Sequence, residues 1–115
     1  MSFKATTRDV GDVTVIDLDG RITLGEGSNL LRDLVRERLG KGRRKILLNM
    51  STVNYVDSTG LGELVSAYRF IKSEGGELKL LGINKKVTDL LQITKLYTVF
   101  DIHNDEGQAI ASFRS

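Results

Sequence analysis

An acid, two hydroxyl side chains and two glycines stand together in the middle of the chain, in the motif Asp57-Ser58-Thr59-Gly60-Leu61-Gly62. The apolar run at 46–48 predicts a buried strand before the motif, and apolar residues at helical spacing follow it as far as Ile71. Hydroxyls at the start of a helix usually indicate a cap. The glycines need another reason, because each lowers helix propensity by about 1 kcal/mol relative to alanine. The motif therefore predicts a strand-to-helix junction that requires bare backbone.

One interpretation of Ser58 is a catalytic nucleophile, which needs a base within hydrogen-bond reach. His103 is the only histidine of the chain, and we expect it to be an exposed residue in a loop between the last strand and the last helix. The residues around Ser58 also lack the Gly-x-Ser-x-Gly pattern of a nucleophile elbow. We therefore predict no catalytic residues and a protein that is not an enzyme.

A nucleotide site is a second interpretation, since Gly60-Leu61-Gly62 lies between a strand and a helix. The segment lacks the third glycine of a dinucleotide-binding turn and the Gly-Lys-Ser/Thr of a P-loop. The chain also has no cysteine and a single histidine, which excludes a zinc cluster or a histidine-rich metal site within one chain. No cofactor and no metal site are predicted.

A third interpretation is a regulated hydroxyl at Ser58, at or beside the N-cap of the helix. A phosphate there would meet backbone N–H groups and the positive end of the helix, so it would not melt the helix. It would add about −1.5 to −2 charges to the surrounding surface and could switch off the docking of a partner. The alternative is that Ser58 is only a cap, and the residues alone leave the two interpretations open.

Composition limits the class of protein. The chain has 115 residues, 40% of them hydrophobic and 28% charged, which predicts one globular domain spanning 1–115. The net charge is +2, and the densest basic segment, 36–45, favours a helix end over a phosphate-binding patch and has no aromatic residue for base stacking. No signal peptide and no apolar run of about 20 residues is present. We predict a soluble cytoplasmic protein with no membrane span and no nucleic-acid partner.

The periodicity predicts an alternation of strands and helices after an initial hairpin. The first two strands are expected near 3–8 and 13–18 around a turn at 9–12, followed by a loop at 20–27. A helix carrying Leu30 to Leu39 is expected to be capped by Ser28 or Asn29 and ended by Gly40 and Gly42.

The second half continues the pattern. It is predicted to contain a central strand at 45–49, a helix at 59–74 ended by Gly75-Gly76, and a strand at 77–82 with Lys79 on a solvated face. A short helix capped by Asn84, a strand at 98–102 and a helix capped by Asn104 or Asp105 follow. The order β-β-α-β-α-β-α-β-α predicts an α/β fold with a mixed sheet.

The segment 53–65 closely resembles the signature of STAS domains, specifically of bacterial anti-sigma factor antagonists, whose hallmark is Asp-Ser-Ser/Thr-Gly followed by an aliphatic residue and Gly. The segments 15–22 and 91–100 resemble other parts of that family, so the resemblance covers nearly the whole chain. It implies a STAS-type mixed five-stranded sheet with about four helices packed mainly on one face. Two segments differ from many relatives: Asn49-Met50-Ser51 replaces Asp-Leu-Ser, and the loop after Ile22 lacks an acidic residue.

The resemblance also implies a function. In such proteins the serine that matches Ser58 is phosphorylated by a serine kinase that is itself the anti-sigma factor, and Thr59 is a second choice of acceptor here. The unphosphorylated form binds the kinase and releases the sigma factor, a PP2C-type phosphatase restores the serine, and ATP belongs to the kinase. We expect a monomer or weak dimer. The predicted partner-binding residues are Asp57, Ser58, Thr59, Gly60, Leu61, Gly62, Arg21 and Thr23.

Two alternatives belong to other classes. The chain could be a STAS module that scaffolds or senses within a signalling complex or a lipid-transport assembly. It could also be an enzyme that uses Ser58 as a nucleophile, for which turnover of an ester by the purified protein would be required.

Overall fold

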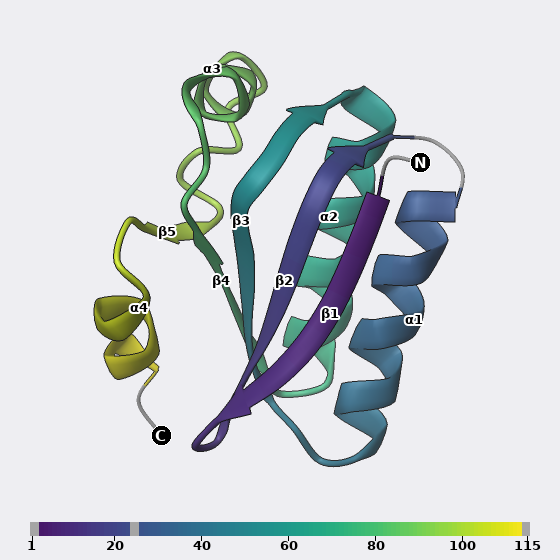
Figure 1. Cartoon of the computed structure of the whole chain (residues 1–115), viewed down its shortest axis with the longest axis vertical. Helices are drawn as coiled ribbons and strands as arrows, with labels where there is room; N and C mark the ends of the chain where they lie inside the picture. Colours follow the sequence, from purple (N-terminus) through teal and green to yellow (C-terminus); the bar gives the residue numbers. More distant parts are fainter. Residues whose placement is uncertain (1–2, 24–25, 114–115) are drawn as a thin grey trace.

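A mixed five-stranded sheet with strand order β1-β2-β3-β4-β5 organises the molecule (Figure 1). The computed structural model describes residues 3–23 and 26–113, with the side chains of 26–29 outside the description. The strands are β1 (Phe3–Val10), β2 (Val13–Ile22), β3 (Lys45–Val56), β4 (Glu77–Leu81) and β5 (Asp101–His103). The helices are α1 (Glu26–Gly40), α2 (Ser58–Ser73), α3 (Lys85–Ile93) and α4 (Glu106–Ser112). The predicted element order and the mixed five-stranded α/β architecture are confirmed.

The helices divide between the two faces of the sheet. β1 and β2 form an antiparallel hairpin, and every later strand is parallel to its neighbour. Because the parallel strands follow one another in a single direction, right-handed crossovers place their connecting helices on one face. Figure 1 shows α1 and α2 together on that face and α4 on the opposite side of the sheet. The prediction that the helices pack mainly on one face is confirmed.

Two apolar clusters stabilise these layers. The larger one joins the sheet to α1, α2 and α3 through side chains such as Ile16, Leu48 and Leu64, which are fully buried. The smaller one lies between the other face and α4. Its members come from three strands and from the end of the chain around α4, namely Val13, Val15, Leu47, Leu81, Ala109 and Phe113.

β3 is longer than predicted. Two bulges interrupt the alternation of its side chains, and the sequence pattern therefore did not reveal its second half. Between the pairs Asp17–Asn49 and Asp19–Thr52, β2 advances by two residues and β3 by three. A second shift follows Gly20, whose φ of 103° only glycine adopts readily. From Met50 onward every third residue, namely Met50, Val53 and Val56, is buried, so a period of two does not describe this half of the strand.

The predicted loop at 20–27 is wrong in its bounds, because β2 continues past the bulges. β2 continues to Ile22, which is fully buried, and α1 already begins at Glu26. Leu24 and Gly25 lie outside the described residues. Ser28 and Asn29 are inside α1, so the prediction that one of them caps this helix is wrong.

The face of β4 that was predicted to be solvated is covered by α4. Lys79 is only 8% exposed; its ammonium pairs with Asp101 and lies 5.1 Å from the centre of the Phe113 ring. A lysine stem can line an apolar surface while its charge is paired, so the alternation Leu78-Lys79-Leu80 does not require solvent on one face.

The last strand begins three residues later than predicted. Phe100 is buried in the larger cluster with its ring edge-on to Tyr68, 5.5 Å between centroids, and pairing with β4 starts only at Asp101. Phe100 therefore serves core packing instead of the ladder, whereas Val99 is exposed. His103 lies in β5 and is partly buried, so its prediction as an exposed loop residue is also wrong.

Most helix ends follow the predicted signals. Asn84 caps α3 and Asp105 caps α4, each through a side-chain oxygen that accepts from a backbone N–H three residues later. Gly40 ends α1, and Gly75 adopts a positive φ directly after α2. No helix in the described part of the chain is long and apolar enough to cross a membrane.

Candidate functional site

Asp57 joins the end of β3 to the start of α2. Its backbone is extended, and its Oδ1 accepts a hydrogen bond of 2.7 Å from the N–H of Gly60. Its own N–H donates to the carbonyl of Ile22 at 3.3 Å, and its carbonyl accepts from the N–H of Leu61 at 2.8 Å. Asp57 therefore supplies the N-cap, and the helix start is secured without the hydroxyl of Ser58.

Ser58 and Thr59 are the first two residues of α2, and both are exposed. Within residues 3–23 and 26–113, neither hydroxyl has a hydrogen-bond partner. The interpretation of Ser58 as only a cap thus loses its basis, since Asp57 fills that position. Two exposed hydroxyls stand instead at the positive end of a helix, beside backbone N–H groups of the first turn.

The two glycines of the motif serve different purposes. A Cβ on Gly60 would lie 2.0 Å from the carbonyl oxygen of Ile22, so this glycine is required for the approach of the chain's own β2. A Cβ on Gly62 would meet nothing within 4 Å, and Gly62 is exposed. Bare backbone is needed as the sequence predicted, but at Gly60 the neighbouring backbone belongs to the same chain.

The remaining predicted partner-binding residues differ in exposure. Leu61 belongs to the larger apolar cluster and is 5% exposed, and Gly60 is buried, so both support the surface from behind. Arg21 is exposed and Thr23 is partly buried at the end of β2. We call the exposed group at this edge the acceptor surface; it comprises Arg21, Tyr55, Ser58, Thr59 and Gly62.

Tyr55 is a member of the acceptor surface that sequence reasoning missed. It pairs with Arg21 across the β2–β3 ladder, is 41% exposed, and its ring centre lies 4.8 Å from the Arg21 guanidinium carbon. The sequence signal was an aromatic residue, Tyr55, directly before the aliphatic Val56. That signal was hidden because β3 was predicted to end at Asn49.

His103 does not meet Ser58. The ladder places His103 beside Leu81, which lies beside Asn49, and β3 continues from Asn49 to Val56 over about 20 Å at about 3.3 Å per residue. The imidazole Nε2 of His103 lies 3.2 Å from Asp101 and 3.4 Å from the hydroxyl of Ser112. The described residues therefore place no histidine base beside Ser58.

The pKa values of three carboxylates are shifted on the face of the sheet that α4 covers. Hydrogen bonds from the Arg8 guanidinium hold the pKa of both Asp17 and Glu106 below their usual values, and Lys79 lowers the pKa of Asp101 in the same way. Arg8 joins Asp17 of β2 to Glu106 of α4, whereas Asp101 pairs with Lys79 of β4 and with His103 of β5. These carboxylates form no part of the acceptor surface.

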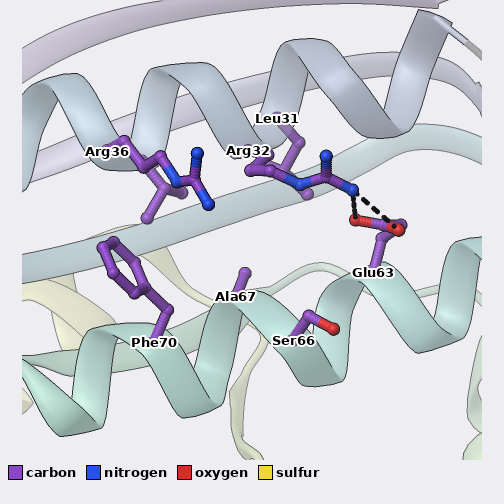
Figure 2. A pocket seen from close by; sticks show the side chains of 8 residues that line it. Leu31, Arg32, Arg36, Glu63, Ser66, Ala67 and Phe70 are labelled. Atoms are coloured by element: carbon purple, nitrogen blue, oxygen red, sulfur yellow. Dashed lines mark hydrogen bonds and ion pairs between the residues drawn. The ribbon is translucent and has the colours of Figure 1, made fainter.

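A recess between α1 and α2 also stands apart from the motif (Figure 2). Its volume is about 100 Å³, and Leu31, Val35 and Ala67 contribute apolar side chains to its lining. The Arg32–Glu63 pair, 3.0 Å, bridges the two helices, and the Arg36 guanidinium carbon lies 5.7 Å from the centre of the Phe70 ring. These cross-helix contacts hold α1 against α2 and thereby support the helix that begins at Ser58.

Known proteins resemble this chain in sequence and in fold. The STAS domain family model matches residues 4–109. An anti-sigma F factor antagonist of Paenibacillus polymyxa is 30% identical over 91 residues, which is 75% of this chain and 78% of that protein. An anti-sigma factor antagonist of Mycobacterium paratuberculosis has a TM-score of 0.85 at 18% identity, covering 99% and 96% of the two chains. The phosphorylated form of the Bacillus cell fate determinant SpoIIAA has a TM-score of 0.76 at 20% identity, covering 96% and 100%.

Proposed function

The chain belongs to the STAS domain family, and on that premise we propose that it is an anti-sigma factor antagonist. In this proposal the unphosphorylated form binds an anti-sigma factor serine kinase and thereby frees the sigma factor. Phosphorylation of Ser58 switches the binding off, and a PP2C-type phosphatase restores the hydroxyl. The names of relatives such as the Paenibacillus polymyxa antagonist support the first part.

One observation supports the switch above all others. Ser58 is exposed at the start of α2, while the cap of that helix is supplied by Asp57 through the 2.7 Å bond to Gly60. A phosphate on Ser58 would leave this bond in place, and the positive end of the helix would tolerate its charge. Phosphorylation would therefore change the surface while the fold is preserved.

The chemistry assigns the catalytic work to the partner. The Ser58 hydroxyl attacks the γ-phosphorus of ATP, the bond to the β-phosphate oxygen breaks, and ADP leaves. The kinase supplies ATP, its metal ion and the base that takes the hydroxyl proton. This chain is then a protein substrate and a binding partner, and it needs no catalytic residue or cofactor of its own.

Phosphate mapping tests the acceptor. The full chain is incubated with ATP and the anti-sigma factor kinase encoded in the same genome, and the product is analysed by tandem mass spectrometry. We expect one phosphate on Ser58 in the wild type and in Thr59→Ala, and its loss in Ser58→Ala. Transfer to neither Ser58 nor Thr59 would contradict the proposal, and transfer to Thr59 alone would move the switch by one residue.

Binding tests the direction of the switch. Ser58→Asp is expected to keep the circular dichroism spectrum of the wild type and to bind the kinase more than tenfold more weakly, a change of about 1.4 kcal/mol or more. Ser58→Ala, which carries no charge, serves as the matched control. Equal affinity of Ser58→Asp and the wild type in a calorimetric titration would rule out an off-switch at this residue.

A further inference from the structure

An open groove adjoins the acceptor surface on the side of α3. Its volume is about 300 Å³, and it lies between the end of β3 and the outer side of α3. We call it the α3 groove, lined by Tyr55, Val56, Lys86, Val87, Asp89, Leu90 and Ile93. Val56 stands two residues before Ser58, so the groove and the acceptor hydroxyl share one edge of the sheet.

The α3 groove exposes apolar surface that the fold does not need. α3 already buries Val87 and Leu91 against the core. Ile93 points outward instead and is 77% exposed, the highest value among the large hydrophobic residues that the structure describes. Together with the exposed ring of Tyr55, Ile93 gives the groove an apolar rim next to Ser58. Exposed apolar surface of this kind, bordered by polar residues, marks interaction sites.

Lys86 and Asp89 line the groove, and two further cations, Lys85 and Arg21, contact lining residues, so three positive charges stand against one negative charge. Lys86 is exposed, Arg21 lies against the Tyr55 ring, and neither forms an ion pair with a carboxylate among the residues that the structure describes. Asp89 is already paired with Lys85 at 3.1 Å. Lys86 in the groove and Arg21 against its Tyr55 ring are therefore left unpaired in the described part of the chain, while Asp89, the carboxylate in the lining, is neutralised by Lys85. This arrangement is complementary to an apolar side chain between acidic residues.

We propose that the α3 groove receives an apolar side chain, flanked by carboxylates, of the anti-sigma factor partner. The inference deepens the proposed function by assigning the chemistry of the docking segment. It also predicts that a phosphate on Ser58 would weaken docking by electrostatic repulsion. The N–H of Asp57 is bonded to Ile22, next to Arg21, so a phosphate on Ser58 brings negative charge to the same edge and opposes an acidic segment.

A peptide titration tests this chemistry without the kinase. The probe is acetyl-Glu-Leu-Glu-Phe-Glu-amide, added to the ¹⁵N-labelled full chain and followed by NMR. We expect amide shifts to change at Tyr55 and along α3, and binding at least tenfold weaker when Lys replaces Glu or Ser replaces both apolar residues in the peptide. Absence of shifts at these positions, or equal binding of the lysine peptide, would overturn the inference.

Variants of the chain locate the site. Ile93→Ser should lower the affinity for the peptide at least fivefold while the NMR spectrum remains that of a folded protein. Val99→Ser, at an exposed apolar residue outside the groove, should leave the affinity unchanged. Lys86→Gln should reduce both the affinity and its dependence on salt, and Ser58→Asp should also weaken the peptide.

The two proposals can fail separately. A kinase that binds the wild type and Ile93→Ser equally would overturn the docking inference and leave the phosphorylation switch untouched. Phosphate mapping that excludes Ser58 and Thr59 would refute the switch, while a positive peptide titration would still establish the groove as a site for acidic apolar segments.

Discussion

The acceptor surface and the face under α4 are stabilised in opposite ways. At the acceptor surface the fit is made by backbone, with Gly60 against the carbonyl of Ile22 and the cap of Asp57, while the hydroxyls stay unbonded. Under α4 an apolar cluster is bordered by charged side chains that pair with one another. Arg8 bonds Asp17 and Glu106 at 2.7 Å each, and Lys79 pairs with Asp101.

This difference separates the parts of the molecule that serve the fold from those available to another molecule. Apolar packing and charges that pair within the chain hold α4 to the sheet, so few unpaired groups are left there for a partner. At the acceptor surface, backbone contacts lie beneath exposed hydroxyls and an exposed cation, so we expect this region to keep its shape if a partner or a phosphate binds. Substitutions that damage only one of the two regions test the distinction.

The largest effect is expected at Gly60, because its contact is backbone against backbone. Gly60→Ala places a Cβ 2.0 Å from the Ile22 carbonyl oxygen, and neither strand nor helix can yield without losing the junction. We expect a loss of about 3 kcal/mol or more in the free energy of unfolding, at the upper end for overpacking.

Gly62→Ala is the matched control for this prediction. Its Cβ would meet nothing within 4 Å, so it should gain up to about 1 kcal/mol from the higher helix propensity of alanine. Urea unfolding of both variants and the wild type measures the difference. Two variants of equal stability would show that the close approach to Ile22 is not required.

On the α4 face, Asn49 is expected to have the next largest effect. Its amide donates to Asp17 Oδ1 at 2.8 Å, and its own oxygen accepts from the N–H and the hydroxyl of Ser51. Asn49→Asp would place a second carboxylate against Asp17 and should reduce stability by about 1–3 kcal/mol at neutral pH.

The pH dependence of Asn49→Asp has a definite sign. The like charge of Asp17 raises the pKa of the new carboxyl in the folded state, so its penalty is present above that pKa and relieved as the pH falls and the carboxyl protonates. The difference in stability from the wild type should therefore shrink between pH 7 and pH 4.5 in urea titrations. A constant difference would show that charge repulsion is not its cause.

The sequence predicted the element order because each helix and most strands carry their own local signal. Caps such as Asn84 and stops such as Gly75 act within a few residues, and the structure confirms them. The errors occur where distant contacts decide the outcome. β3 continues past Asn49 because β2 pairs with it through two bulges, and Lys79 is buried because α4 returns to cover β4.

The candidate site shows the same limit. The motif located the helix start, and the need for bare backbone at Gly60 was correct, but the residue that approaches it is Ile22, far away in sequence. Tyr55 and the α3 groove could not be predicted, because their exposure follows from the bulges and from the position of α3. Whether the predicted contact residues bind a partner stays a prediction.

A smaller effect is expected from removing the two aspartate caps, one in each region. Asp57→Ala and Asp105→Ala each remove a carboxylate that accepts from a backbone N–H, at 2.7 and 2.8 Å, and should each reduce stability by about 1 kcal/mol. Serine at either position can still cap and should restore most of the loss.

Only Asp57→Ala should also slow phosphorylation of Ser58, measured as initial rate, since Asp105 lies outside the acceptor surface. Equal rates in both variants would mean that the cap does not hold the acceptor in position.

The smallest effect concerns the Arg8 network, which is partly exposed and therefore screened by solvent. Arg8 lowers the folded-state pKa of Asp17 and Glu106, so their contribution to stability is present above about pH 4 and is lost as the pH falls through the lowered values. Arg8→Gln should reduce the free energy of unfolding by about 0.5–1 kcal/mol at pH 7 and by less at pH 2.5.

Lys85→Gln is the matched control, because it removes the same charge from the more exposed pair with Asp89 and should change stability by a few tenths of a kcal/mol at most. If Arg8→Gln lost as much stability between pH 5 and pH 2.5 as the wild type, the carboxylates under α4 would not depend on Arg8. The contrast between a face bordered by paired charges and a surface held by backbone contacts would then not hold for the α4 face.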